Sequence, residues 1–158
     1  MAKLYLIALA AMVVTTGAAQ ARCSNATIQG DWAFTVHGNA LTPDGTSVAR
    51  IDGVGIITFD GFGNLRQQDF IVVNGVHPDP IGFHRNESGT YQVGADCTGI
   101  ATINFDTDKP PAQQSAVDLE FVIARAARSI HTVVSAARPA AAGLRQVYSD
   151  LEKADLLQ

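Results

Sequence analysis

Apolar and polar residues alternate along most of the chain between residues 30 and 135, a period of two that is typical of strands with one buried face. Three runs show the alternation best, with apolar residues or glycine at every second position: Trp32, Phe34 and Val36; Ile51, Gly53, Gly55, Ile57 and Phe59; Val117, Leu119, Phe121 and Ile123. Further strands are predicted at 65–73, 89–93, 98–105 and 129–135. The pattern therefore predicts seven or eight antiparallel strands.

Turn signals separate these strands. The sequence Asp-Gly-Phe-Gly-Asn at residues 60–64 predicts a tight turn, because Gly and Asn supply the positive φ angles that such a turn requires. Residues 49–73 are therefore predicted to form a β-hairpin. A second hairpin pairs 89–93 with 98–105 around residues 94–97. Residues 74–85 contain two glycines and two prolines and are predicted to be a long loop, with a short edge strand in part of it as the alternative.

The period changes near the C-terminus. After Pro139, a favoured first residue of a helix, Leu144, Val147, Tyr148 and Leu151 recur at helical spacing. The spacing predicts an amphipathic helix within residues 139–158 that packs on the outside of the sheet.

Many short antiparallel strands joined by tight turns define an all-β domain over residues 22–138, followed by the helix. Two architectures fit this order of elements. One is a closed antiparallel barrel of seven or eight strands, which we favour, and the other is a two-sheet β-sandwich.

The first 21 residues have the organisation of a secretory signal. Lys3 precedes an apolar run over residues 4–14, and the segment ends on Ala19, Gln20 and Ala21. The apolar run is too short to span a bilayer, so no stable membrane insertion is expected after cleavage. We expect a secreted or periplasmic protein. Cys23 and Cys97, the only two cysteines, are expected to form a disulfide in that oxidising compartment.

Charge and motif content exclude several functions. With 11 basic and 15 acidic residues, the chain has a net charge of −4 and lacks the basic surface that nucleic-acid binding requires. Neither a nucleophile elbow nor a phosphate-binding loop is present, so no catalytic residue is assigned and a binding role is preferred to an enzymatic one.

Histidines and carboxylates are the candidate metal-ligand and acid–base groups of the chain. The four histidines, His37, His77, His84 and His131, do not have the close spacing of a zinc site, although His77 and His84 share a predicted loop with Asp79. No metal or cofactor is predicted from them. Four carboxylates alternate with apolar residues and are expected to face solvent: Asp52, Asp69, Asp118 and Glu120.

The Gly-x-Trp sequence at residues 30–32 opens the first strand, shortly after Cys23. With the long first loop at residues 38–48, the hairpin connections and the helix predicted after the last strand, it resembles the calycin group, which includes lipocalins and allene-oxide-cyclase-type barrels. In small barrels of this kind such a tryptophan commonly closes one end, so Trp32 is expected to be buried there.

A closer resemblance is to a class of small secreted bacterial proteins without assigned function. Six elements carry it in order: Cys23, residues 30–34, the turn at 60–64, Gly-Thr-Tyr at 89–91, Asp-Cys-Thr-Gly at 96–99 and Phe-Val-Ile at 121–123. This resemblance implies a calycin-like barrel and implies no activity.

The function that we predict from these observations is the binding of a small apolar molecule inside the barrel. Gly53 and Gly55 remove side-chain volume from the inward face of their strand, which leaves room for a ligand. The residues expected to line the site are Trp32, Phe34, Gly53, Gly55, Ile57, Phe59, Phe105, Leu119 and Phe121.

Two alternatives remain open at this stage. An allene-oxide-cyclase-like cyclase or isomerase would show a buried polar or charged group in the cavity. A protein-interaction module would have a filled core and use loops 38–48 and 74–85. The ligand, the binding partner and the oligomeric state do not follow from the residues.

Overall fold

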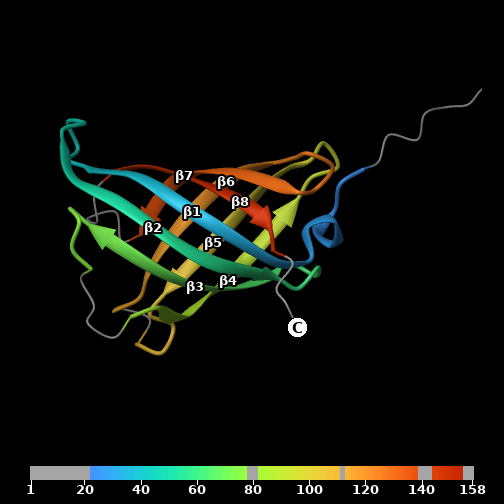
Figure 1. Cartoon of the computed structure of the whole chain (residues 1–158), viewed down its shortest axis with the longest axis horizontal. Helices are drawn as coiled ribbons and strands as arrows, with labels where there is room; N and C mark the ends of the chain where they lie inside the picture. The colour runs from blue at the N-terminus through green and yellow to red at the C-terminus, as the bar shows by residue number, and fades with distance from the viewer. Residues whose placement is uncertain (1–21, 78–81, 111–112, 139–143, 155–158) are drawn as a thin grey trace, which may run out of the picture.

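A computed structural model describes residues 22–77, 82–110, 113–138 and 144–154. Within these residues, eight strands form one closed antiparallel barrel in which each strand pairs with the next and the last pairs with the first (Figure 1). The strands are β1 (Gly30–Leu41), β2 (Ser47–Phe59), β3 (Asn64–Val73), β4 (His84–Val93), β5 (Thr98–Phe105), β6 (Ser115–Ala124), β7 (Ser129–Arg138) and β8 (Leu144–Lys153). The barrel is confirmed and the sandwich is excluded.

The predicted C-terminal helix is wrong over the residues that the structure describes. Residues 144–153 form strand β8, which pairs with β1 along residues 32–41 and with β7 along residues 129–133. Val147 and Leu151, both buried, are four positions apart, and this spacing fits one helix face as well as one strand face. Pairing decides between them, because only an eighth strand removes the open edges of β1 and β7.

The two predicted hairpins are confirmed, as β2 pairs with β3 and β4 with β5. β4 begins at His84, within the predicted loop 74–85, and β7 extends to Arg138 and is followed by β8. The predicted signal at residues 1–21 lies outside the described residues, as do residues 139–143 and 155–158 of the predicted helix.

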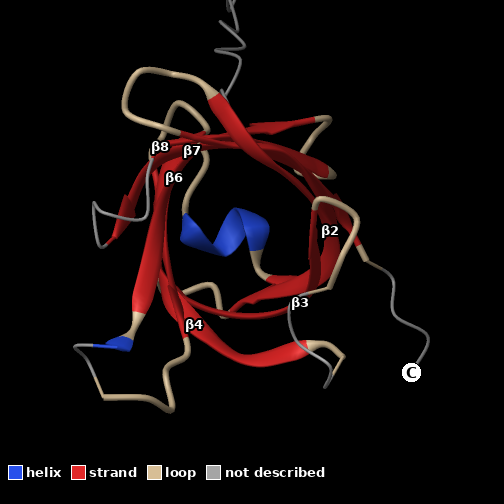
Figure 2. Cartoon of the chain, turned by 90° about the vertical axis from the view of Figure 1, so that its left-hand side faces the viewer, coloured by secondary structure: helices blue, strands red, loops and turns tan. Residues whose placement is uncertain are grey.

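A short 3-10 helix, η1 (Asn25–Ile28), lies across one end of the barrel, and Figure 2 shows it within the ring of strands. Ile28 and Trp32 are both completely buried there, and the indole Nε1 of Trp32 donates a hydrogen bond of 2.7 Å to the Ile28 carbonyl. Trp32 thus occupies the closed end, as its position in the sequence predicts.

Two further connections hold η1 in this position. The Cys23–Cys97 disulfide joins the segment before η1 to the β4–β5 turn, which confirms the predicted bond. The Asn25 side chain accepts a hydrogen bond from the Val93 backbone at 2.8 Å, and the Tyr91 hydroxyl donates to the Asn25 carbonyl at 3.2 Å. The segment around η1, which closes this end of the barrel, is therefore attached to β4 and the β4–β5 turn by a disulfide and by hydrogen bonds.

Candidate functional site

The barrel interior is not completely filled. It holds a cavity of about 130 Å³ and a smaller one of about 40 Å³. The two cavities are adjacent inside the barrel, because they share six lining residues: Phe34, Gln67, Ile103, Leu119, Thr132 and Ser149. Most side chains around both spaces are apolar. Gln67, Asp69, Thr132 and Ser149 supply polar groups to the wall of the larger cavity.

Most residues expected to line a ligand site do line these cavities. Phe34 and Leu119 contact both, Phe105 lines the larger one, and Ile57, Phe59 and Phe121 line the smaller one. Trp32 lines neither described cavity, because it lies in the packing around η1. Gly53 and Gly55 also line neither.

The space above the two glycines of β2 is taken by neighbouring side chains. A Cβ atom on Gly55 would lie 2.5 Å from Cζ of Phe34, and one on Gly53 would lie 2.4 Å from Cδ1 of Ile71. The expectation that these glycines leave room for a ligand is therefore corrected: they make room for the Phe34 ring and the Ile71 side chain.

Three polar side chains are buried on the β3 and β4 side of the interior. Gln67 is 8% exposed, Asp69 3% and Glu87 6%. Their connection is through the Gln67 amide, whose Nε2 donates to Asp69 Oδ2 at 3.2 Å and to Glu87 Oε2 at 2.9 Å. A single amide therefore joins two carboxyl groups inside a mostly apolar barrel.

The prediction that Asp69 faces solvent is wrong. On β3 the inward positions are Leu65, Gln67 and Asp69, so two successive inward residues are polar and their pattern resembles that of an outward face. The other three carboxylates behave as expected: Asp52 and Asp118 are partly exposed, and Glu120 is exposed.

A β-bulge brings His84 to this cluster. Gln67 pairs with Glu87 whereas Asp69 pairs with His84, so two steps along β3 correspond to three along β4. The additional residue on β4 changes which side chains point inward. His84 consequently stands opposite Asp69, with its Nδ1 3.4 Å from Asp69 Oδ1, while Arg85 is exposed.

The buried carboxyl groups have altered acidities. Burial, reinforced by the nearby Asp69 charge, raises the pKa of Glu87 from 4.5 to about 8. Burial also raises the pKa of Asp69, and the nearby His84 opposes that increase. At neutral pH, Glu87 is therefore largely a neutral acid.

This acidity predicts a pH-dependent stability in metal-free buffer. Because the pKa of Glu87 is higher in the folded state, the folded protein holds a proton that the unfolded chain lacks between pH 4.5 and about 8. Stability contributed by this proton is present at low pH and is lost as pH rises. Between pH 5.5 and 7.5, we expect the free energy of unfolding of wild type to fall by about 2–3 kcal/mol more than that of Glu87→Gln.

Urea denaturation of wild type and Glu87→Gln at both pH values measures this difference. The variant keeps the size and shape of the side chain but cannot ionise, so other titrating groups cancel in the comparison. Parallel pH profiles for the two proteins would contradict a raised pKa at Glu87.

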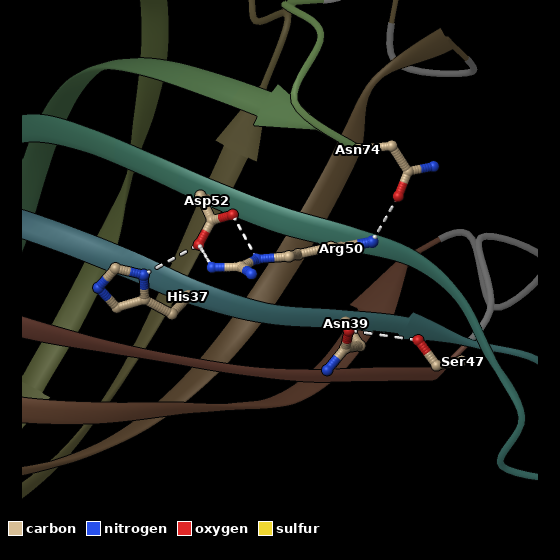
Figure 3. Close-up of polar contacts among 6 residues, drawn as sticks. All are labelled: His37, Asn39, Ser47, Arg50, Asp52 and Asn74. Carbon is tan, nitrogen blue, oxygen red and sulfur yellow. Dashed lines mark hydrogen bonds and ion pairs between the residues drawn. The ribbon is translucent and has the colours of Figure 1, made fainter.

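Of the other histidines, His77 lies beside His84, with ring centroids 5.8 Å apart, whereas His37 and His131 pair with carboxylates elsewhere on the barrel. On the outer side of β1 and β2, His37 Nδ1 lies 3.1 Å from Asp52 Oδ1, and Arg50 Nε donates to Asp52 Oδ2 at 2.7 Å (Figure 3). The Arg50 backbone N–H is bonded to Asn74, and Ser47 donates to Asn39 in the same view.

Hydrogen bonds lower the pKa of Asp52, with the largest effect from Arg50 and a smaller one from His37. On β7 and β8, His131 contacts exposed Asp150 at 2.6 Å between Nδ1 and Oδ1. His77 stacks on Phe70, with ring centroids 3.9 Å apart. The surface pairs are ordinary exposed ion pairs and add little stability.

The sequence reasoning missed Gln67, Glu87 and the inward position of His84. The inward position of Glu87 could have been predicted, because it lies an even number of residues from buried Tyr91 and Val93 on the same strand and so faces the same side. The inward position of His84 could not have been predicted in this way, because the bulge reverses the alternation of inward and outward residues between Glu87 and His84.

Comparison with known proteins found no matching family model, no similar curated protein and no similar solved structure. Among the described residues, no helix has both the length and the apolar character needed to cross a membrane.

Proposed function

We propose that this chain is an exported, calycin-like barrel protein that binds a small, largely apolar molecule with one polar group inside the barrel. The observation that carries the proposal is the open interior volume, with apolar walls and Asp69 and Gln67 on one side. Export is supported by the leader-like residues 1–21 together with the Cys23–Cys97 disulfide.

The cavity volume limits the size of the ligand. The space of about 130 Å³ is similar to the dry engineered cavity of ~150 Å³ that binds benzene in another protein. It is well below the ~300 Å³ at which pockets for drug-sized molecules begin. The structure therefore favours a ligand of about the size of one aromatic ring or a short branched chain.

The polar group of the ligand would meet Asp69. Its Oδ1 atom is buried and accepts no well-formed hydrogen bond from the described residues, since the contact with His84 is 3.4 Å long. A ligand hydroxyl placed in the cavity can donate to this oxygen. We therefore expect phenol to bind more tightly than toluene, by about fivefold for a hydrogen bond of about 1 kcal/mol.

Titration calorimetry with phenol and toluene tests the proposal. Val134 lines the larger cavity, so Val134→Phe should fill it and abolish binding of both compounds. Val133, the neighbouring residue, is 49% exposed, and Val133→Phe is the matched control that should bind as wild type does. Asp69→Leu should remove the preference for phenol and retain toluene binding.

Absence of saturable toluene and phenol binding to wild type would overturn the proposal. Equal loss in the Val133 and Val134 variants would also overturn it, because the effect would then not be specific to the cavity. Circular dichroism of each variant verifies the fold before titration.

The buried carboxyl groups favour a second candidate, an isomerase or cyclase similar to allene-oxide-cyclase-type barrels. In this function Asp69 would exchange a proton with an apolar substrate in the cavity. Mass spectrometry of copurified small molecules after incubation in D₂O would test it. Deuterium incorporation with wild type and none with Asp69→Asn supports catalysis, whereas equal incorporation excludes this role for Asp69.

A further inference from the structure

We propose that Asp69, His84 and Glu87 form a binding site for a divalent transition-metal ion of the Zn²⁺ type. One donor atom from each of the three side chains lies within 4.8 Å of the other two. Asp69 and Glu87 are buried, and His84, which pairs with Asp69 across the β3–β4 ladder, is partly buried. The site shares Asp69 with the cavity of the proposed apolar ligand, but the inference does not require that ligand.

The donor set determines the class of ion. One imidazole nitrogen with two carboxylate oxygens suits Zn²⁺ and similar first-row ions, whereas Ca²⁺ and Mg²⁺ prefer oxygen ligands alone. Ligand atoms at ~2.0–2.2 Å from zinc lie roughly 3–4 Å apart, so the three side chains need to close by about 1 Å. Rotation of the Glu87 and His84 side chains would have to supply this movement.

An independent observation points to a cation at this position. Asp69 is 3% exposed, and its Oδ1, which is directed toward His84, accepts no well-formed hydrogen bond from the described residues. A buried carboxylate oxygen without a well-formed hydrogen bond is unfavourable, and a bound cation would satisfy it. The adjacent carboxyl group of Glu87 adds a second oxygen ligand to the same side.

The Gln67 amide is suited to a positioning role. Its Nε2 holds Asp69 Oδ2 and Glu87 Oε2, which leaves Oδ1 of Asp69 and Oε1 of Glu87 for an ion. Outer hydrogen bonds of this kind orient metal-binding carboxylates. The β4 bulge contributes the third ligand, since it places His84 opposite Asp69.

The arrangement would leave one coordination position toward the cavity. Three protein ligands with an open fourth position are typical of zinc sites that also bind water or a small molecule. Asp69 lines the larger cavity, so this position would face its open volume.

Calorimetric titration of the untagged, chelator-treated protein with Zn²⁺ at neutral pH tests the site. We expect one ion per chain, with affinity lowered at least about tenfold in His84→Ala and in Glu87→Gln. Glu87→Gln retains the shape of the side chain, so it remains informative if His84→Ala folds poorly. Mg²⁺ should bind much more weakly than Zn²⁺.

His131→Ala is the matched control, because His131 also contacts a carboxylate but does so on the barrel surface. It should bind Zn²⁺ as wild type does. The proposal is overturned if wild type shows no saturable Zn²⁺ binding, or if His84→Ala and Glu87→Gln bind as wild type does. Toluene titration in EDTA is a separate measurement, so failure of the metal site and failure of the apolar site are distinguishable.

Discussion

Replacement of Trp32 with alanine is expected to lower the free energy of unfolding by about 3–5 kcal/mol, the range for removing a large aromatic side chain from a core. Trp32 is completely buried, and its indole is bonded to the Ile28 carbonyl in η1. The substitution therefore leaves a cavity and also removes the donor that satisfies a buried carbonyl. Urea denaturation followed by circular dichroism measures the loss without relying on the removed tryptophan.

Two controls separate these contributions. Phe62 is 85% exposed in the β2–β3 turn, so Phe62→Ala should change stability by no more than about 0.5 kcal/mol. Trp32→Phe retains much of the apolar volume but not the donor, and it should fall between wild type and Trp32→Ala. If Trp32→Ala were as stable as Phe62→Ala, the tryptophan would not be a structural plug.

Removal of the disulfide is the second large effect that we expect. The bond between Cys23 and Cys97 spans a sequence separation of 74 residues. For a loop of this length, the chain-entropy model gives a stabilisation of about 4 kcal/mol. The double variant Cys23→Ser, Cys97→Ser should show this loss in urea denaturation, and it avoids leaving one unpaired thiol.

Reducing agent provides the control for the disulfide prediction. It should destabilise wild type toward the level of the double variant and should leave the double variant unchanged. Equal denaturation midpoints for oxidised wild type and the double variant would contradict the prediction.

The barrel was predictable because its inward residues alternate cleanly on several strands. Trp32 and Phe34 on β1, and Ile57 and Phe59 on β2, are buried at every second position. The turn at residues 60–64 has a clear chemical basis as well, since the Asp60 carboxylate accepts three backbone N–H groups and Gly61 and Gly63 have positive φ.

The eighth strand was not predictable from its own residues. Val147 and Leu151 fit a helix and a strand equally well, so the local pattern is ambiguous. The decisive interaction is non-local, because β8 pairs along its whole length with β1, at the opposite end of the domain, and only partly with β7. Tertiary pairing determines the conformation of such a segment.

The polar cluster was missed for two physical reasons. Gln67 and Asp69 are polar residues of the kind usually found on a solvent-facing surface, yet both lie at inward-facing positions of β3. His84 reaches Asp69 only through an additional residue in β4, and bulges are not visible in the residue pattern. Sites of this kind depart from the general rule that barrel interiors are apolar.

The pairing of β1 with β8 imposes an order on folding. The first strand of the barrel has one edge without a partner until the last strand is in place, so closure requires contacts between residues more than one hundred positions apart in the sequence. Such non-local closure is slow compared with hairpin formation. A chain truncated before Leu144 would expose the edges of β1 and β7, and these edges would pair with other copies and lead to aggregation.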